Sequence, residues 1–115
     1  MDIQQNVQEQ LNQFQQVQQQ AQSVAMQKQT VNLQINESKK ALDELSKTSD
    51  DQEVYKTAGS LLIKTTKAES ESELKDSIEM LEIRAKTIEK QEKRIASRLE
   101  ELQTSIQTAM NQMQQ

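Results

Sequence analysis

Apolar residues recur at steps of three and four along two long segments of this chain, and this spacing constrains its fold more than any other feature. The period of 3.5 residues persists for roughly five heptads in each segment, which is typical of a coiled coil. Polar residues take the positions that complete the pattern: Gln10, Lys28, Ser38 and Glu92. The apolar positions are Val7, Phe14, Val17, Ala21, Val24, Val31, Ile35, Leu42 and Leu45 in the first segment, and Leu74, Ile78, Leu81, Ala85, Ile88, Ile95, Leu99, Leu102, Ile106, Ala109 and Met113 in the second.

The segment between these two stretches is the one part of the chain with a strand-like composition. Residues 54–57 and 61–65 are rich in β-branched and apolar side chains, and Gly59 between them can adopt the positive φ of a tight turn. An irregular loop joining two helices is the alternative. A lone two-stranded hairpin is marginal in water, and its edges leave backbone groups unpaired. We therefore expect hairpins of several subunits to pair edge to edge and to bury Leu61, Leu62 and Ile63.

Composition supports two helical arms around this centre. Only 33% of the residues are hydrophobic, which is too few for a large globular core, and the absence of Pro leaves the helices uninterrupted. We predict a mainly α fold: one domain, a long antiparallel two-helix coiled coil with one central β-hairpin used for oligomer assembly. The expected parts are a helix over 1–48, a hairpin over 54–65 and a helix over 70–115, the last opened by a capping box of Ser70 and Glu73.

Two positions in the apolar pattern carry charges of opposite sign, Lys28 and Glu92. If the chain folds back near residue 60, these two positions fall in the same layer of the coiled coil. A polar residue in such a position often fixes the register of the helices at some cost in stability. We interpret the pair as a register determinant; the alternative is two unrelated side chains that reach out to solvent.

The outer ends of the two arms are poor in charge. No charged residue occurs from Gln10 to Gln27 or after Glu101, and an antiparallel pairing brings these stretches together at one end, which we call the tip. Chain ends fray, so apolar side chains there become available to a partner. Leu11 and Met110 lie off the apolar pattern, whereas the others can equally complete it. The candidate contact residues are Ile3, Val7, Leu11, Phe14, Ile106, Met110 and Met113.

Several functional classes are disfavoured by the composition. A net charge of −4 argues against nucleic acid as a partner. No segment approaches the roughly 20 apolar residues of a membrane span, and the first residues do not resemble a secretion signal, so we expect a cytoplasmic protein without a membrane partner. With no His and no Cys, we expect no catalytic, cofactor or metal residues. The acidic residues are expected to form a solvated face with i,i+4 pairs such as Glu71 with Lys75 and Glu82 with Lys86.

Four stretches of the sequence together carry a resemblance to a known family: 6–16, 27–30, 53–63 with the Glu53-Val54-Tyr55-Lys56 run, and 86–92. They resemble the β subunits of archaeal prefoldin, and the resemblance covers nearly the whole chain. It implies an ATP-independent holdase in which two α-type and four β-type subunits form a hexamer through their hairpins. The tips of the coiled coils would bind unfolded polypeptides and pass them to a group II chaperonin.

On this resemblance, the tip residues named above would contact clients. The residues that would serve assembly are Val54, Tyr55, Leu61, Leu62 and Ile63. Two other classes of function stay open from the residues alone. A structural tether or scaffold would use the same coiled coil without binding unfolded clients. A carboxylate-based enzyme would need a cleft that moves the pKa values of paired acids apart.

Overall fold

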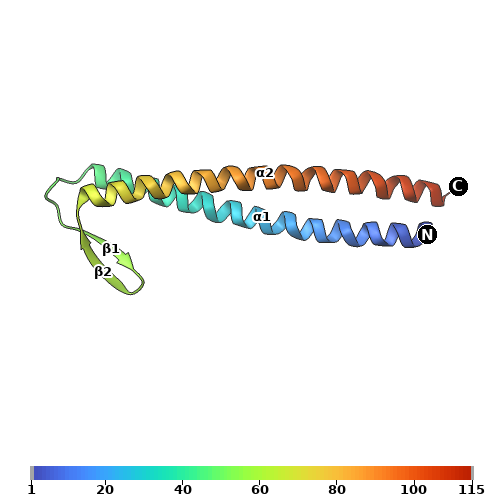
Figure 1. Ribbon diagram of the computed structural model, residues 1–115, viewed down its shortest axis with the longest axis horizontal. Helices are drawn as coiled ribbons and strands as arrows, with labels where there is room; N and C mark the ends of the chain where they lie inside the picture. Colours follow the sequence, from blue (N-terminus) through green and yellow to red (C-terminus); the bar gives the residue numbers. More distant parts are fainter. Residues whose placement is uncertain (1, 115) are drawn as a thin grey trace. The chain divides into compact units, whose positions relative to one another are not determined.

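The computed structural model describes residues 2–114 and contains two long helices with a hairpin between them (Figure 1). Helix α1 spans Ile3–Ser46 and helix α2 spans Lys67–Met113. Strands β1, Val54–Ala58, and β2, Leu61–Thr65, form a two-stranded antiparallel sheet. The predicted mainly α fold with one central hairpin is confirmed, and the alternative of an irregular loop is wrong.

The chain divides into two compact units. One contains Met1–Gln29 and Thr87–Gln115, so that the first part of α1 is grouped with the last part of α2. The other is Thr30–Lys86, which holds the end of α1, the hairpin and the start of α2. Within the first unit, Figure 1 shows the two ends of the chain on the same side, as an antiparallel pairing requires.

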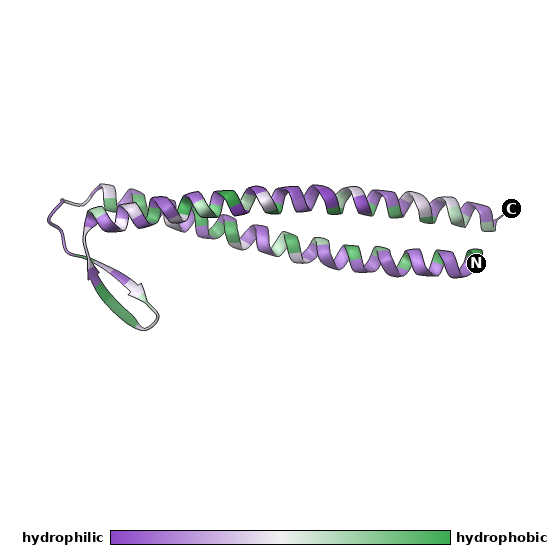
Figure 2. Cartoon of the chain, viewed as in Figure 1, coloured by the Kyte–Doolittle hydropathy of each residue, from purple (hydrophilic) through white to green (hydrophobic). Residues whose placement is uncertain are grey.

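The contact line between the helices, which we call the seam, follows the predicted apolar pattern. Within both helices, the predicted seam positions are buried or half-buried, except Lys28 and Met113. Hydrophobic residues recur at regular intervals along both helices (Figure 2). Burying this stripe while leaving polar side chains outside is the main source of stability for a helix pair of this kind. The buried hydrophobic residues are Val7, Val24, Val31, Ile35, Ile88, Leu102 and Ala109.

Ion pairs between the helices report the same alignment in each unit. In the first unit, Lys28 Nζ lies 3.0 Å from Glu92 Oε1. In the second, Lys39 Nζ lies 3.3 Å from Glu82 Oε1. Glu82 therefore pairs across the seam rather than with Lys86 along its own helix, which corrects the i,i+4 pairing expected from the sequence. Both pairs join residues whose numbers sum to about the same value, as antiparallel pairing of the helices within each unit requires.

The hairpin turn depends on its glycine. The strands pair from Val54 opposite Thr65 to Ala58 opposite Leu61, which leaves Gly59 and Ser60 as a two-residue turn. Gly59 has φ of 61°, and among the described residues no other residue has a positive φ. A positive φ at the first central position alone is the requirement of a type II′ turn, which glycine meets without steric cost.

Helix α2 begins three residues earlier than the sequence suggested. Thr66 caps it: the backbone N–H of Glu69 donates to Thr66 Oγ1 at 3.1 Å. The Glu69 side chain in turn accepts a hydrogen bond from Thr65 Oγ1, also at 3.1 Å. The predicted cap residue Ser70 is buried inside the helix instead. Thr66 and Glu69 have the same spacing as the expected box of Ser70 and Glu73, and the structure uses the earlier of the two.

Candidate functional site

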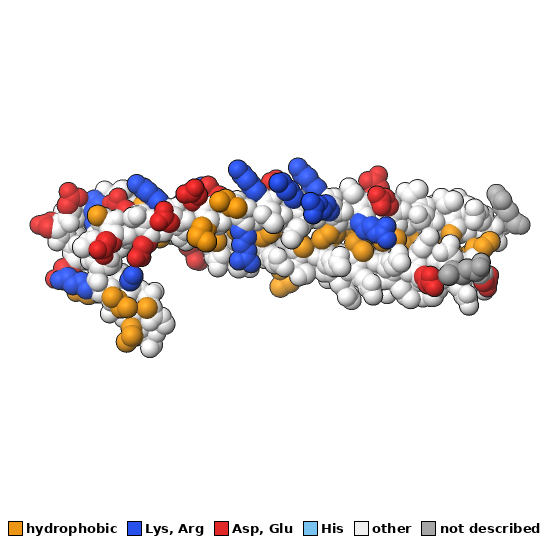
Figure 3. Space-filling model, in the orientation of Figure 1, with side chains coloured by type: hydrophobic (Ala, Val, Ile, Leu, Met, Phe, Trp, Pro, Cys, Tyr) orange, Lys and Arg blue, Asp and Glu red, His pale blue; other side chains and the backbone are white. Residues whose placement is uncertain are grey.

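The hairpin carries exposed apolar side chains on both of its faces. Opposed residues in an antiparallel ladder project to the same side, so Leu61 and Ile63 share one face, whereas Tyr55 and Leu62 share the other. All four are exposed, Leu62 most of all at 72%. Val54, the fifth predicted assembly residue, is half-buried against the base of the helices. Figure 3 shows the apolar cluster at the hairpin.

A groove of about 910 Å³ lies between β1, the end of α1 and the start of α2. Ala41, Leu45, Val54 and Leu74 contribute apolar side chains to its lining. An ion pair joins two of its other lining residues, because Lys56 Nζ of β1 lies 3.2 Å from an oxygen of Glu73 in α2. The hairpin is therefore held beside the helices through its first strand, while β2 offers its apolar residues to solvent.

Lys67 ties the loop before the hairpin to the start of α2. Its side chain is only 15% exposed, and its ammonium donates a 2.7 Å hydrogen bond to the carbonyl oxygen of Thr48. Carboxylates of Asp50 and Glu71 lie 3.5 and 3.9 Å from the same nitrogen. Glu71 thus pairs with Lys67 rather than with Lys75. Sequence reasoning missed Lys67, because its acceptors come from a loop whose path no residue pattern predicts.

Replacing Lys67 with methionine is expected to destabilise the chain by about 2 kcal/mol, because the hydrogen bond to a charged donor is lost and a carbonyl is left without its partner. Methionine keeps the length and apolar stem of lysine. Urea unfolding followed by far-UV circular dichroism measures the loss. Lys75→Met is the control, since Lys75 is an exposed position of the same helix, and a change there should stay within about 0.5 kcal/mol. Equal losses in the two variants would contradict this assignment.

The predicted register pair lies face to face. The two side chains of Lys28 and Glu92 are 49% and 32% exposed, so their 3.0 Å ion pair is partly solvated. Such a pair adds little stability, because solvent screens it. Its opposite signs nevertheless disfavour alignments that would place either charge against an apolar layer. Their selection of the register stays a prediction.

The predicted tip residues fall into two groups. Val7 is 8% exposed and completes the seam, and Phe14 and Ile106 are half-buried beside it. The other predicted residues are exposed near the start of α1 or the end of α2, so the tip has exposed apolar side chains without any rearrangement. These exposed residues are Ile3, Leu11, Met110 and Met113.

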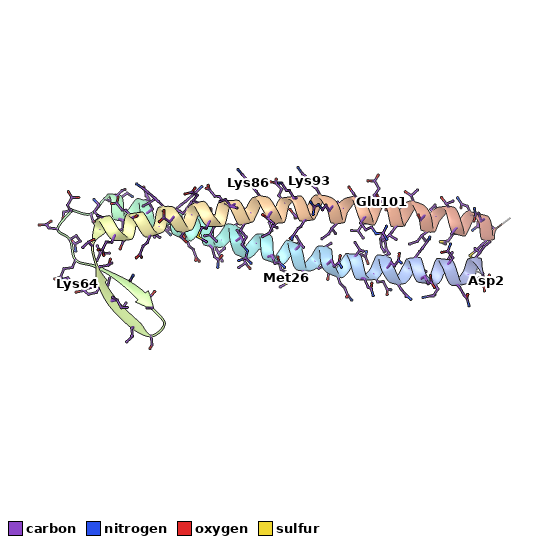
Figure 4. The ribbon with its side chains drawn as sticks, viewed as in Figure 1. Asp2, Met26, Lys64, Lys86, Lys93 and Glu101 are labelled. Atoms are coloured by element: carbon purple, nitrogen blue, oxygen red, sulfur yellow. The ribbon has the colours of Figure 1, made fainter. Side chains whose placement is uncertain are left out.

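Four further apolar residues are exposed outside the hairpin and are not among the predicted tip residues, and the sequence analysis did not single them out. Met26 and Leu33 belong to α1, and Met80 and Ile83 belong to α2. Figure 4 shows Met26 on the side of α1 that faces away from α2. All four lie off the heptad pattern, and this departure from the pattern is the sequence feature that could have predicted their exposure. They provide matched control positions for the substitutions proposed below.

Comparison with known proteins agrees with this architecture. The model of the prefoldin subunit family matches residues 8–113. The chain belongs to the prefoldin subunit family. It is 51% identical to prefoldin subunit beta of Methanobrevibacter smithii over 99% of this chain and 98% of the relative. It is 48% identical to prefoldin subunit beta of Thermococcus kodakarensis over 90% of this chain and 89% of the relative.

Solved prefoldin structures share the fold. The crystal structure of the prefoldin beta subunit from Thermococcus strain KS-1 matches with a TM-score of 0.82 and 49% identity, covering 90% of this chain and 91% of that one. The prefoldin beta2 subunit of the same strain matches with a TM-score of 0.72 and 20% identity, covering 79% and 97%. The second match shows the fold alone. Prefoldins are a chaperone family rather than an enzyme family.

Among residues 2–114, neither helix contains a stretch that is both long enough and apolar enough to cross a bilayer.

Proposed function

We propose that this prefoldin subunit works in the cytoplasm as a β-type subunit of a hexamer with two α-type and four β-type subunits. The hexamer is an ATP-independent holdase: it binds unfolded polypeptides at its coiled-coil tips and delivers them to a group II chaperonin. In this proposal the chain has no enzymatic activity, no cofactor, and neither nucleic acid nor membrane as a partner.

The hairpin surface supports the assembly part of the proposal. Tyr55, Leu61, Leu62 and Ile63 are exposed on a two-stranded sheet whose outer edges carry unpaired backbone groups. Pairing with the hairpins of other subunits would satisfy those groups and bury the apolar side chains together. The ion pair of Lys56 with Glu73 favours the placement of the hairpin beside the helices, although a pair this exposed to solvent contributes little stability.

The exposed tip residues are the observation that carries the client-binding part. Ile3, Leu11, Met110 and Met113 offer apolar surface in a region with very few charges. An unfolded polypeptide exposes apolar segments of many shapes, and unbranched methionine adapts to varied shapes. Contacts of this kind are individually weak and tolerant of sequence, which suits a subunit that must hold many different clients.

Removing two of these side chains should weaken client binding. We expect the double variant L11S/M110S, assembled with a prefoldin alpha subunit, to bind unfolded α-lactalbumin at least about tenfold more weakly, because two apolar contacts worth roughly 1 kcal/mol or more each are lost. Reduced, carboxymethylated α-lactalbumin with a fluorescent label serves as the probe, and fluorescence anisotropy without nucleotide gives Kd.

The control is L33S/M80S, which removes the same two residue types from exposed positions outside the tip. Its Kd should stay within about twofold of the unmodified complex, since no contact with the client is lost. Equal weakening by both variants would refute the tip as the binding site. A complex that does not bind the unfolded probe at all would favour a tether or scaffold.

A further inference from the structure

One polar atom in the seam lacks a partner. Gln10 occupies a seam position near the tip, and its side-chain oxygen Oε1 is buried without a hydrogen bond. Among the described residues, it is the one buried side-chain nitrogen or oxygen in this state. The ion pair of Lys28 with Glu92 shows the alignment of the two helices in this unit, and in that alignment Gln10 lies level with position 110. The seam positions on α2 that flank it are Ala109 and Met113, and neither side chain can donate a hydrogen bond.

This arrangement makes closure of the tip costly. When the helices close, the Gln10 oxygen loses its water and gains no protein donor, whereas opening the tip restores its hydration. The other polar residues at matching positions differ, since Lys28 and Glu92 satisfy one another and remain partly solvated. An unsatisfied buried group in a native structure calls for an explanation. One explanation is that the unpaired oxygen destabilises the closed tip and so favours its opening.

We propose that Gln10 is a weak point built into the seam, which sets how readily the tip opens and thereby how readily clients reach Val7 and Phe14. Val7 lies three residues before Gln10 and Phe14 four residues after it, so the three share one face of α1. Opening at Gln10 would add these covered side chains to the apolar surface already exposed. The client part of this inference rests on the proposed function and specifies how its site is controlled.

Hydrogen exchange of the full chain tests the opening step directly. We expect Q10L to slow amide exchange about tenfold or more in residues 3–14 and 106–113, because an apolar side chain removes the penalty for closure. Q10E should accelerate the same exchange, since a carboxylate costs more to bury than an amide. The control is Q15L, an exposed position of the same uncharged stretch, where exchange should not change. Equal exchange rates for Q10L and the unmodified chain would overturn the proposal.

Client affinity tests the consequence. In the complex with a prefoldin alpha subunit, we expect Q10L to raise the Kd for labelled, reduced and carboxymethylated α-lactalbumin about threefold or more. Q15L should bind as well as the unmodified complex or better, because it adds a leucine without closing the seam. Slower exchange with unchanged affinity in Q10L would overturn the link between opening and binding. If the unmodified complex does not bind this probe, the proposed function fails, and the exchange rates alone decide whether Gln10 governs the tip.

Discussion

The triple variant L61T/L62T/I63T is expected to abolish assembly with a prefoldin alpha subunit while leaving the two helices folded. Each of these side chains is exposed on the hairpin, and fully burying one of them on assembly is worth about 1.5 to 3 kcal/mol. Threonine keeps a high strand propensity, so the hairpin itself can still form. Sedimentation velocity of the mixed subunits measures the size of the particle, and far-UV circular dichroism measures helix content.

The matched control for this variant removes as many exposed apolar side chains from the helices. L33Q/M80Q/I83Q changes residues that lie outside the hairpin and away from the seam, with glutamine chosen because it favours helix. This control should assemble as the unmodified subunit does. The assignment of the hairpin as the assembly surface does not survive if the threonine variant forms a particle of full size.

Substituting aspartate for Ile88 should destabilise the chain by about 3 to 5 kcal/mol, because it places an unpaired carboxylate in the apolar seam. Ile88 is 2% exposed and sits in the middle of α2. Such a loss is a large share of the stability of a chain of this size. Urea unfolding of the full chain, monitored by far-UV circular dichroism, gives the difference in free energy of unfolding.

Ile83→Asp provides a control with identical chemistry on the same helix. Ile83 is 61% exposed and lies five residues away, so its replacement should change the free energy of unfolding by about 0.5 kcal/mol or less. The comparison cancels the helix propensity of aspartate, which both variants share. Similar losses at the two positions would show that burial in the seam is not what distinguishes them.

The heptad pattern predicted the fold well because a long, nearly uniform apolar stripe has few alternative ways to be buried. Val31 and Ile88, two of the most deeply buried residues, were both assigned to the seam from spacing alone. The hairpin was equally predictable from the sequence, since Gly59 is the single glycine of the chain and separates two strand-like runs. Local sequence and the final fold agree at these positions, which is when prediction from sequence succeeds.

Features that depend on the folded loop or on exact packing were not predictable. Lys67 is an ordinary lysine in the sequence, and only the path of the loop brings the Thr48 carbonyl to it. The start of α2 was misplaced because two candidate capping boxes follow the hairpin, Thr66 with Glu69 and Ser70 with Glu73, and local sequence does not decide between them. At the tip, spacing alone could not separate the buried Val7 from the exposed Met113, since both fit the same pattern.

The scarcity of charge near the tip has a consequence for the conditions under which this subunit can work. Attraction between opposite charges weakens as ionic strength rises, whereas the removal of apolar surface from water does not, and excluded salts strengthen it. From Gln10 to Gln27 and after Glu101 there is no charge for salt to screen. Binding through such a surface would therefore be at least as strong in a concentrated cellular electrolyte as in a dilute one.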